Sequence, residues 1–367
     1  MEEEYNVSIV YGKKHVHYAW LDAIRFIAAF LVLLCHSRND FFMKYNFLDA
    51  DQQGPISFLF YLIGRMGSEA VFAFFILSGF LVGGPGLERI FKSTFDLKNY
   101  TVNRSVRIML PLVSAIVMYL VFAPFVGENI NWWNVIGNLF SLQCILCDPL
   151  VTPFWSLSYE VWFYVFLAAF ALVMQRKRWG YLLFIICCLV YLKMNALYLL
   201  MWLIGAAAYL TKPKKFNKWQ FFASIMLLIV AIAFTQMTKA SKAMSFDLPK
   251  MGEGYNLILC ISMGWFVQQV ILLQPKYKWL KTIEDAFGKL ANFSYTLYLT
   301  HRITLLVIFT LFLKKEEADL SLPNIMMFVF IMLICLVVAY MFYYIAERHT
   351  KDVKVWIKKK LCIDNAY

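Results

Sequence analysis

Apolar stretches of bilayer-spanning length alternate with short polar segments along almost the whole chain. A helix needs about 20 mostly apolar residues to cross the hydrocarbon core of a membrane, and it satisfies its own backbone hydrogen bonds there. We identify ten apolar stretches, most of which approach or exceed this length, at residues 18–37, 57–86, 105–125, 154–174, 179–193, 195–210, 219–236, 255–273, 291–313 and 325–346. The pattern therefore predicts an all-α polytopic membrane protein with about ten transmembrane helices.

The fifth and sixth stretches are the least regular part of this pattern, because they are short and separated only by Met194. They fit either a tight hairpin on the outer side or a pair in which one stretch is re-entrant. The sequence shows no internal repeat and no soluble domain. We therefore divide the chain into a cytoplasmic N-terminal segment (1–17), one membrane domain (18–347) and a basic cytoplasmic C-terminal tail (348–367).

The first apolar stretch is expected to remain in the protein as an uncleaved helix. Glu2, Glu3 and Glu4 stand where a secretory signal carries positive charge. The stretch is also longer than the apolar region of a signal, and it contains the charged residues Asp22 and Arg25.

Positive charge is distributed unevenly between the two sides of the predicted topology. The chain is 61% hydrophobic and has a net charge of +12, and a basic balance is also found in proteins that bind nucleic acid. With the N-terminus in the cytoplasm, 23 Lys and Arg residues fall in inner segments, 8 in outer segments and four within spans. This asymmetry is the positive-inside bias of membrane proteins. It places both termini in the cytoplasm, beside membrane lipids, and it removes nucleic acid as an expected partner.

Ionisable side chains inside the first stretch mark it as part of a candidate site, because charges within a membrane are costly and seldom face lipid. Arg25 and His36 are eleven residues apart, so they share a helix face with about 16 Å of rise between them. Asp22 lies within ion-pair reach of Arg25, which is therefore either structural or functional. His36, near the outer end, is favoured as catalytic because imidazole accepts a proton near neutral pH.

Two further groups lie toward the inner side of the membrane. Arg104 and Arg107 stand one helical turn apart, so their side chains point the same way. Paired guanidinium groups suit a polyphosphate ligand, and anchoring to lipid headgroups is the alternative. Ser78 and Gly79 lie in the second stretch, where small side chains admit either a slender ligand or a neighbouring helix.

Three candidates lie near the outer side. Glu160, in the fourth stretch, falls at about the height of His36, where it can orient the imidazole or bind a sugar hydroxyl. Trp155 is a candidate for substrate binding, with an aromatic belt as the alternative. Glu69, at the outer end of the second stretch, is a further buried carboxylate and a candidate for substrate binding.

The ninth stretch places His301 and Arg302 near mid-membrane, and we expect one of the two to be structural, with His301 a candidate for substrate binding. Cys144 and Cys147 fall in a predicted outer loop, where they form either a disulfide or two small apolar contacts. No histidine lies near these cysteines, so no metal site is expected.

Five motifs together resemble the acyltransferase-3 family of membrane-integral acyltransferases, which includes bacterial O-antigen acetylases. They stand in the family's order and at about its spacing, as LDAIRFIAAFLVLLCHS, FFILSGFL, RSVR, FWSLSYEVWFY and FSYTLYLTH. The resemblance covers about residues 18–347, nearly the whole chain. Each motif alone is weakly specific, whereas five in register are strongly so.

The resemblance implies a ten-helix domain that uses cytosolic acyl-CoA and acylates a glycan outside the cytoplasm. The family's pattern of a basic residue, ten residues and a histidine falls on Arg25 and His36, which makes His36 the catalytic residue. The family's Arg-x-x-Arg pattern falls on Arg104 and Arg107, and the resemblance gives the arginines the acyl donor to bind. Its Ser-Gly-Phe pattern falls on Ser78, Gly79 and Phe80, and we take Ser78 and Gly79 as further candidates for donor binding.

The sequence therefore favours an O-acetyltransferase of the bacterial inner membrane. Acetyl-CoA is the expected donor, and a cell-surface glycan such as lipopolysaccharide, or a lipid-linked sugar, is the expected acceptor. His36 acts either as a general base or as the carrier of an acyl-histidine intermediate, with Glu160 in an orienting role. Succinyl is the alternative acyl group.

Two other classes of membrane protein compete with this interpretation. A transporter or flippase of sugar-linked lipid also places charges along a pathway. Against it, the chain has no inverted repeat and no matched pair of spans broken by Gly or Pro. A receptor or structural membrane protein explains the aromatic belts but leaves the buried arginines and histidine without a role.

Overall fold

The computed structural model describes residues 18–244, 254–273, 278–313 and 317–363, and within these the regular structure is entirely helical. The helices are α1 (Ala19–Phe41), α2 (Pro55–Ile63), α3 (Gly67–Ser78), α4 (Gly84–Phe91), α5 (Leu97–Phe122), α6 (Trp132–Leu139), α7 (Phe154–Met174), α8 (Arg178–Lys193), α9 (Ala196–Leu210), α10 (Lys218–Met244), α11 (Gly254–Val270), α12 (Lys278–Ala291), α13 (Ser294–Leu311), α14 (Leu322–Ile345) and α15 (Thr350–Lys360). The all-α prediction is thus confirmed. The expected N-terminal segment 1–17 lies outside the described residues.

Six helices in the described ranges are long and apolar enough to cross a membrane, or seven if α8 and α9 count together as one broken span. These two helices meet at an angle of 119°, where the Asn195 side chain accepts a hydrogen bond from the backbone N–H of Leu197 and so caps α9. The sharp bend agrees with the expected irregularity at Met194. The protein is an integral membrane protein, while the count of ten transmembrane helices stays a prediction.

The second predicted stretch is divided differently from the expectation. The separate helix α2 precedes α3, and α3 continues through a π-helical turn (Gly79–Gly83) into α4, which together form a span over Gly67–Phe91. The Tyr61 hydroxyl donates to the carbonyl oxygen of Met43 at 2.6 Å and ties α2 to the segment after α1. A turn at residues 64–66 separates α2 from α3, and the apolar pattern of the sequence shows neither this turn nor the contact of Tyr61.

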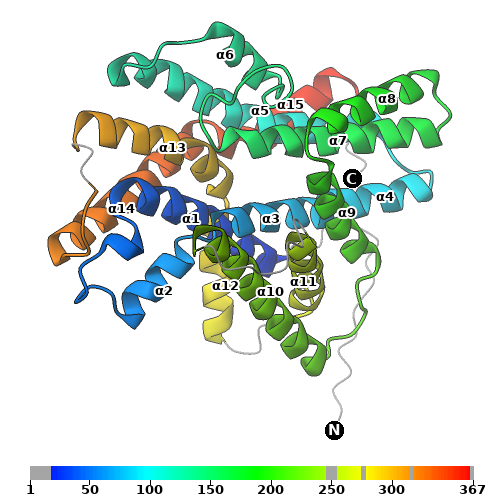
Figure 1. Ribbon diagram of the computed structural model, residues 1–367. Coiled ribbons are helices and arrows are strands. Elements are labelled where there is room, and N and C mark those ends of the chain that lie inside the picture. The colour runs from blue at the N-terminus through cyan, green and yellow to red at the C-terminus, as the bar shows by residue number, and fades with distance from the viewer. Residues whose placement is uncertain (1–17, 245–253, 274–277, 314–316, 364–367) are drawn as a thin grey trace.

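The central helices of the bundle are α1 and α3, which run side by side in Figure 1 and pack on each other. Helix α13 and helix α12 pack against α1, whereas α9 packs against α3 and its π-helical turn. Helix α5 contacts α13 on one side and the C-terminal helix α15 on the other. Segments distant in sequence thus converge around α1, α3 and α5.

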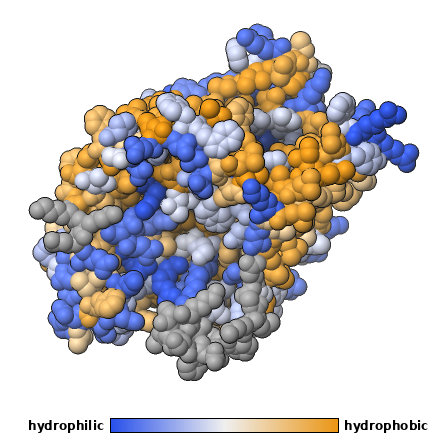
Figure 2. All heavy atoms as spheres, turned by 45° about the horizontal axis from the view of Figure 1, so that its top comes forward, coloured by the Kyte–Doolittle hydropathy of each residue, from blue (hydrophilic) through white to orange (hydrophobic). Residues whose placement is uncertain are grey.

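The outer surface of several helices is strongly apolar. Large exposed side chains cover α10 and α14, among them Met226, Ile229, Phe330, Leu333 and Val337. Figure 2 shows broad hydrophobic areas on one face, with hydrophilic side chains gathered into separate areas. Exposed apolar area on this scale is typical of contact with lipid.

Two glycines set the close approach of α9 to the α3–α4 span. A Cβ atom built on Gly79 would lie 2.0 Å from the backbone oxygen of Trp202, and one built on Gly205 would lie 2.2 Å from the backbone oxygen of Ile76. Small residues at such crossings let membrane helices pack backbone to backbone. Of the two readings of the Ser-Gly pair, the structure gives Gly79 the packing role.

Replacing Gly79 by alanine is expected to destabilise the protein by about 1–3 kcal/mol, because the added methyl group must push two helix backbones apart. Thermal unfolding of purified Gly79→Ala in detergent measures this loss. Gly288→Ala is the matched control, since no atom lies within 4 Å of a Cβ built there, and its stability should stay close to that of the wild type. Equal melting temperatures for Gly79→Ala and Gly288→Ala would contradict the packing role.

Candidate active site

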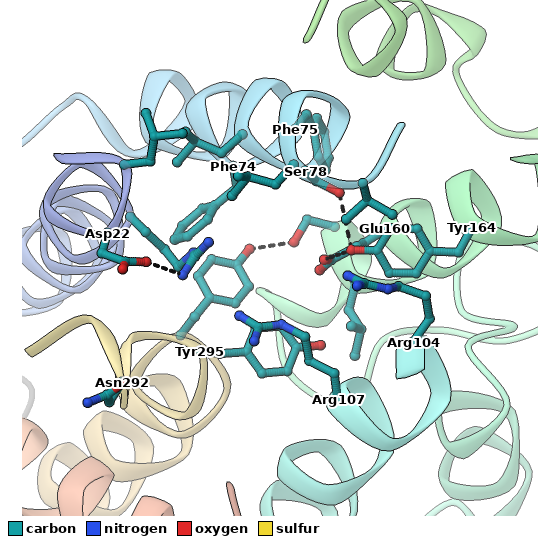
Figure 3. Close-up of a pocket in the computed structure, with 18 of the residues that line it drawn as sticks. Asp22, Phe74, Phe75, Ser78, Arg104, Arg107, Glu160, Tyr164, Asn292 and Tyr295 are labelled. Atoms are coloured by element: carbon teal, nitrogen blue, oxygen red, sulfur yellow. Dashed lines mark hydrogen bonds and ion pairs between the residues drawn. The ribbon is translucent and has the colours of Figure 1, made fainter. Parts of the chain in front are cut away.

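A polar cavity of about 530 Å³ lies among α1, α3, α5, α7, α13 and α15. It is lined on several sides by charged side chains, which point into it from helices far apart in sequence (Figure 3). The charged residues of the lining are Asp22, Arg25, Arg104, Arg107, Glu160, Lys351 and Lys354. Positive charges exceed negative ones, so the cavity suits an anionic ligand.

Arg25 enters the cavity from the first turns of α1. Its guanidinium donates to the Asp22 carboxylate at 2.8 Å, and both side chains keep less than a fifth of their surface exposed. The three-residue spacing on a helix produces this ion pair, as the sequence predicts. Arg25 also lies within electrostatic range of Arg107 and Glu160, so the structural pair forms part of the cavity wall.

Arg104 and Arg107 project from one face of α5 into the same cavity (Figure 3). The Arg104 guanidinium lies 5.9 Å from the centre of the Tyr164 ring, within the range of a cation–π contact. Its buried Nε atom has no hydrogen-bond partner among the described residues. A buried donor without a partner is costly, and a bound anion would satisfy it.

Glu160 is the final acceptor of a hydrogen-bond chain on the cavity wall. The Tyr164 hydroxyl donates to Glu160 at 2.6 Å and lies 3.2 Å from the Ser78 hydroxyl. Trp202 donates from its indole N–H to the Ser78 oxygen at 3.2 Å. Because the single hydroxyl hydrogen of Tyr164 is directed to Glu160, the Ser78 hydroxyl donates to the Tyr164 oxygen. The chain fixes Ser78 in the cavity wall, next to Gly79, which faces α9.

His36 lies outside this cavity. Its neighbour is His301, whereas the similar heights in the membrane had suggested Glu160. Its ring centre is 5.4 Å from that of His301 on α13, and no hydrogen bond joins it to Glu160 among the described residues. Glu160 instead stays with Tyr164 in the cavity. The structure thus separates two groups that similar heights in the membrane placed together.

His301 is completely buried, and its hydrogen bonding defines its tautomer. Its Nδ1 atom is 3.0 Å from the carbonyl oxygen of Leu297. A carbonyl only accepts, so Nδ1 carries the proton and Nε2 carries a lone pair. Nε2 has no partner among the described residues. His301 therefore carries a buried acceptor without a partner among the described residues, and its ring is a neighbour of the His36 ring.

Tyr298 connects the cavity to the histidine pair. It lines the cavity, and its ring centre lies 6.0 Å from that of His301, one helical turn away on α13. Its hydroxyl is held by the Ser156 hydroxyl at 2.6 Å and the backbone oxygen of Pro153 at 3.1 Å. One aromatic ring, that of Tyr298, therefore separates the cavity from His301, and His36 lies on from His301.

Beside the histidine pair, Arg302 forms an ion pair with Asp40, one turn beyond His36 on α1. Both charges lie within electrostatic range of His36. The pair joins α13 to α1 and fixes the histidine-bearing faces against each other. Arg302 is thus the structural member of the His301–Arg302 dipeptide.

The sequence of this chain matches the profile of an acyltransferase domain, that of the acyltransferase-3 family, over residues 18–344. The chain belongs to the acyltransferase-3 family. It is also similar to the acyltransferase MdmB of Streptomyces mycarofaciens, with 28% identity over 151 residues. That alignment covers 40% of this chain and 37% of the relative's length. No solved structure matches the chain.

Two candidate residues of this acyltransferase-3 protein lie in packed surroundings away from the charged cavity wall. Trp155 packs edge-on against Tyr159 and close to Tyr198, with ring centres 5.7 and 5.4 Å apart. Its ring therefore belongs to an aromatic cluster. Glu69 is 1% exposed, and each of its carboxylate oxygens accepts a charge-assisted hydrogen bond from the Lys239 ammonium group at 2.7 Å. Gln236 donates to it as well, at 2.8 Å.

Removing the Glu69 charge is expected to lower the free energy of unfolding by about 2–3 kcal/mol, because Lys239 would keep a partly buried, unpaired charge. Detergent-based unfolding of Glu69→Gln measures this loss. The exposed pair Lys92–Glu88, with a 2.6 Å contact, supplies the control, since Lys92→Met should cost less than about 1 kcal/mol. If Glu69→Gln is as stable as the wild type, the carboxylate does not stabilise the fold, and substrate binding remains its predicted role.

The cavity of this family member also contains residues that the sequence alone does not identify. Tyr295 lines it, and its buried hydroxyl has no partner among the described residues (Figure 3). Lys351 and Lys354 enter from α15, within the segment predicted to be a cytoplasmic tail. Their only sequence signal is a three-residue spacing, which places them on one helix face.

The two cysteines of the loop before α7 are free thiols in the structure. The Cys144 backbone N–H donates to the backbone oxygen of Cys147 at 2.9 Å, closing a tight turn. Partial burial raises the pKa of both thiols above the ordinary value. The structure therefore shows Cys144 and Cys147 without a disulfide bond between them.

Proposed function

We propose that this protein is a membrane acyltransferase that moves an acetyl group from cytosolic acetyl-CoA to a sugar hydroxyl of an extracytoplasmic glycan, with His36 as the catalytic base. The single observation that carries the proposal is the cavity itself. It gathers three arginines from α1 and α5 around one space, and its wall at Tyr298 lies next to His301, the neighbour of His36. Membership of the acyltransferase-3 family supports the reaction class.

The donor is inferred from the charge of the cavity. Arg104 and Arg107 offer planar donor groups that bind phosphate oxygens in pairs, and the unpartnered Nε of Arg104 is one donor in need of an acceptor. Arg25 lies deeper along α1 and is partly neutralised by Asp22. A diphosphate therefore fits between the α5 arginines, with the pantetheine arm directed past Arg25 toward Tyr298.

The length of the arm agrees with this placement. Arg25 and His36 are separated by about 16 Å of helix rise, and an extended pantetheine arm reaches roughly 15–20 Å. The arm has to pass Tyr298 and His301 to bring the thioester to His36. A nucleotide held at the arginine end can therefore stay on one side of the membrane while its acyl group reacts near the other.

In the proposed reaction, His36 accepts the proton of the acceptor hydroxyl as its oxygen attacks the thioester carbonyl carbon. The carbon–sulfur bond then breaks, the CoA thiolate leaves, and the proton passes to it, giving a sugar ester and CoA. The lone pair on Nε2 of His301 supports this role, because it can accept a hydrogen bond from His36 and orient the ring. An acyl-histidine intermediate is the alternative course of the same transfer.

The positive-inside bias supports an inner-membrane protein whose two termini are cytoplasmic. That orientation puts Arg104, Arg107 and α15 on the cytosolic side, where acyl-CoA is available, and His36 toward the outer side. The acceptor is accordingly a cell-surface glycan or a lipid-linked sugar.

The test is to incubate the purified protein with acetyl-CoA labelled in the acetyl group, with and without a cell-envelope glycan fraction. Release of CoA with label in the glycan supports the proposal, and label retained on the protein indicates an acyl-enzyme. Turnover with succinyl-CoA but not acetyl-CoA would reassign the acyl group. Failure to consume any acyl-CoA, combined with movement of sugar-linked lipid in vesicles, would replace the proposal by a flippase.

A further inference from the structure

Helix α15 adds a second positively charged element to the cavity, and it begins beyond the last residue that matches the family profile. The helix packs against α5. Lys351 and Lys354, three residues apart and so on one face, line the cavity together with Arg104 and Arg107. The site of this chain is therefore wider than the family motifs indicate.

The charges around this face do not balance. Lys354 lies within electrostatic range of Arg104, Arg107, Lys351 and a further lysine, Lys358. The carboxylates nearby are fewer than the cations, and each has a hydrogen-bond or ion-pair partner of its own, although Glu160 and Glu347 also lie within electrostatic range of Arg25. Asp22 pairs with Arg25 and Glu160 accepts from Tyr164, while Glu347 accepts from Thr296 and Asp352 faces His349.

A cluster of like charges in a partly buried space is unfavourable unless a polyanion neutralises it. Two buried polar atoms point to such a ligand independently of the charge count, because neither the Arg104 Nε nor the Tyr295 hydroxyl has a partner among the described residues. Both residues line the cavity. The charged cluster therefore lines a preformed site in which buried hydrogen-bond donors have no acceptor.

The cations are graded from the rim of the cavity inward. Lys351 is exposed, whereas Lys354 and both α5 arginines are half-buried, and Arg104 lies over the ring of Tyr164. Ser156 and Tyr298, at the buried end, keep 6% of their surface. A long ligand that enters with its acyl end first therefore leaves its nucleotide end beside α15.

We propose that Lys351 and Lys354 bind the ribose 3′-phosphate of the acyl-CoA donor and so select CoA over donors that lack this phosphate. The inference rests on the proposed function, because it takes acyl-CoA as the ligand. The lysines of α15 and the arginines of α5 suit different phosphate groups of the donor. A terminal phosphate dianion suits ammonium point charges on flexible stems, whereas the bridging diphosphate suits the planar arginine forks.

The experiment compares CoA with 3′-dephospho-CoA, whose only difference is the missing phosphate. Affinities are measured by calorimetry on the purified full-length protein, so that no acceptor is required. The wild type should bind CoA about ten- to a hundredfold more tightly than 3′-dephospho-CoA, as expected for charge-assisted hydrogen bonds. Lys351→Gln/Lys354→Gln should bind both with similar, weak affinity. Lys359→Gln is the control for charge lost from the same helix, since it removes one lysine charge from an exposed position on α15 outside the cavity.

Each outcome of this experiment either supports or overturns the inference. Preference for CoA that is lost in the double variant and kept in Lys359→Gln supports the inference. Equal binding of the two ligands by the wild type, or a preference that survives in the double variant, overturns it while leaving the acyl-CoA donor intact. A loss of equal size in Lys359→Gln also overturns it, as a general charge effect. Binding of neither ligand to the wild type removes the proposed donor and the inference with it.

Discussion

His36→Ala is expected to reduce acyl transfer by about 10²–10⁴-fold, the range that a positioned general base contributes. The imidazole lies beside the free acceptor of His301 and the Asp40–Arg302 ion pair, so the variant removes the proton acceptor without disturbing the distant arginines. Turnover is measured as CoA release from labelled acetyl-CoA with a glycan acceptor. Affinity for CoA, measured separately, should stay near the wild-type value.

His349→Ala serves as the control, because His349 is half-exposed and lies outside the cavity lining. Its turnover should match that of the wild type. A His36→Ala variant with unchanged turnover would exclude His36 as the base. A variant with wild-type turnover but weak CoA binding would instead place His36 in donor recognition.

Neutralising the α5 arginines is expected to weaken donor binding about ten- to a hundredfold for each residue, since each removes a charge-assisted hydrogen bond to phosphate. The relevant variants are Arg104→Gln and Arg107→Gln, measured as the KM for acetyl-CoA at saturating acceptor. The value of kcat should change less, because the arginines are remote from the reacting carbon. Arg104→Lys should recover only part of the loss, because an ammonium group lacks the planar fork.

Arg178→Gln provides the comparison for a lost surface charge, since Arg178 is exposed at the start of α8. Its KM should equal that of the wild type. If Arg104→Gln and Arg107→Gln also show a wild-type KM, the pair anchors lipid headgroups and the donor lies elsewhere.

The membrane architecture was predictable because hydrophobicity acts locally. A stretch of about 20 apolar residues must become a helix in lipid whatever its neighbours do. The helices α1 and α7 therefore lie close to their predicted ranges, whereas α5 begins at Leu97, ahead of the predicted start at residue 105. The structure differs from the predicted span where a tertiary contact and a turn divide an apolar stretch. The hydrogen bond from Tyr61 and the break before Gly67 separated α2 from the predicted second span.

Site residues on a single helix were equally accessible to sequence reasoning. The pairs Asp22–Arg25 and Arg104–Arg107 follow from helical spacing alone, and the structure shows the first as an ion pair and the second on one cavity wall. Pairings between helices were not accessible in this way. The assignment of Glu160 to His36 relied on height in the membrane, which leaves the rotation and neighbours of a helix undefined.

The sequence by itself determined an all-helical membrane protein, its family, and a set of costly charges that must face the interior. Only the tertiary structure decided which of these charges share a space: it brought α15 onto α5, placed His301 beside His36, and occupied Glu69 with Lys239. The physical reason is that insertion into lipid is governed by local apolar content, whereas partner choice depends on side-chain packing between segments hundreds of residues apart.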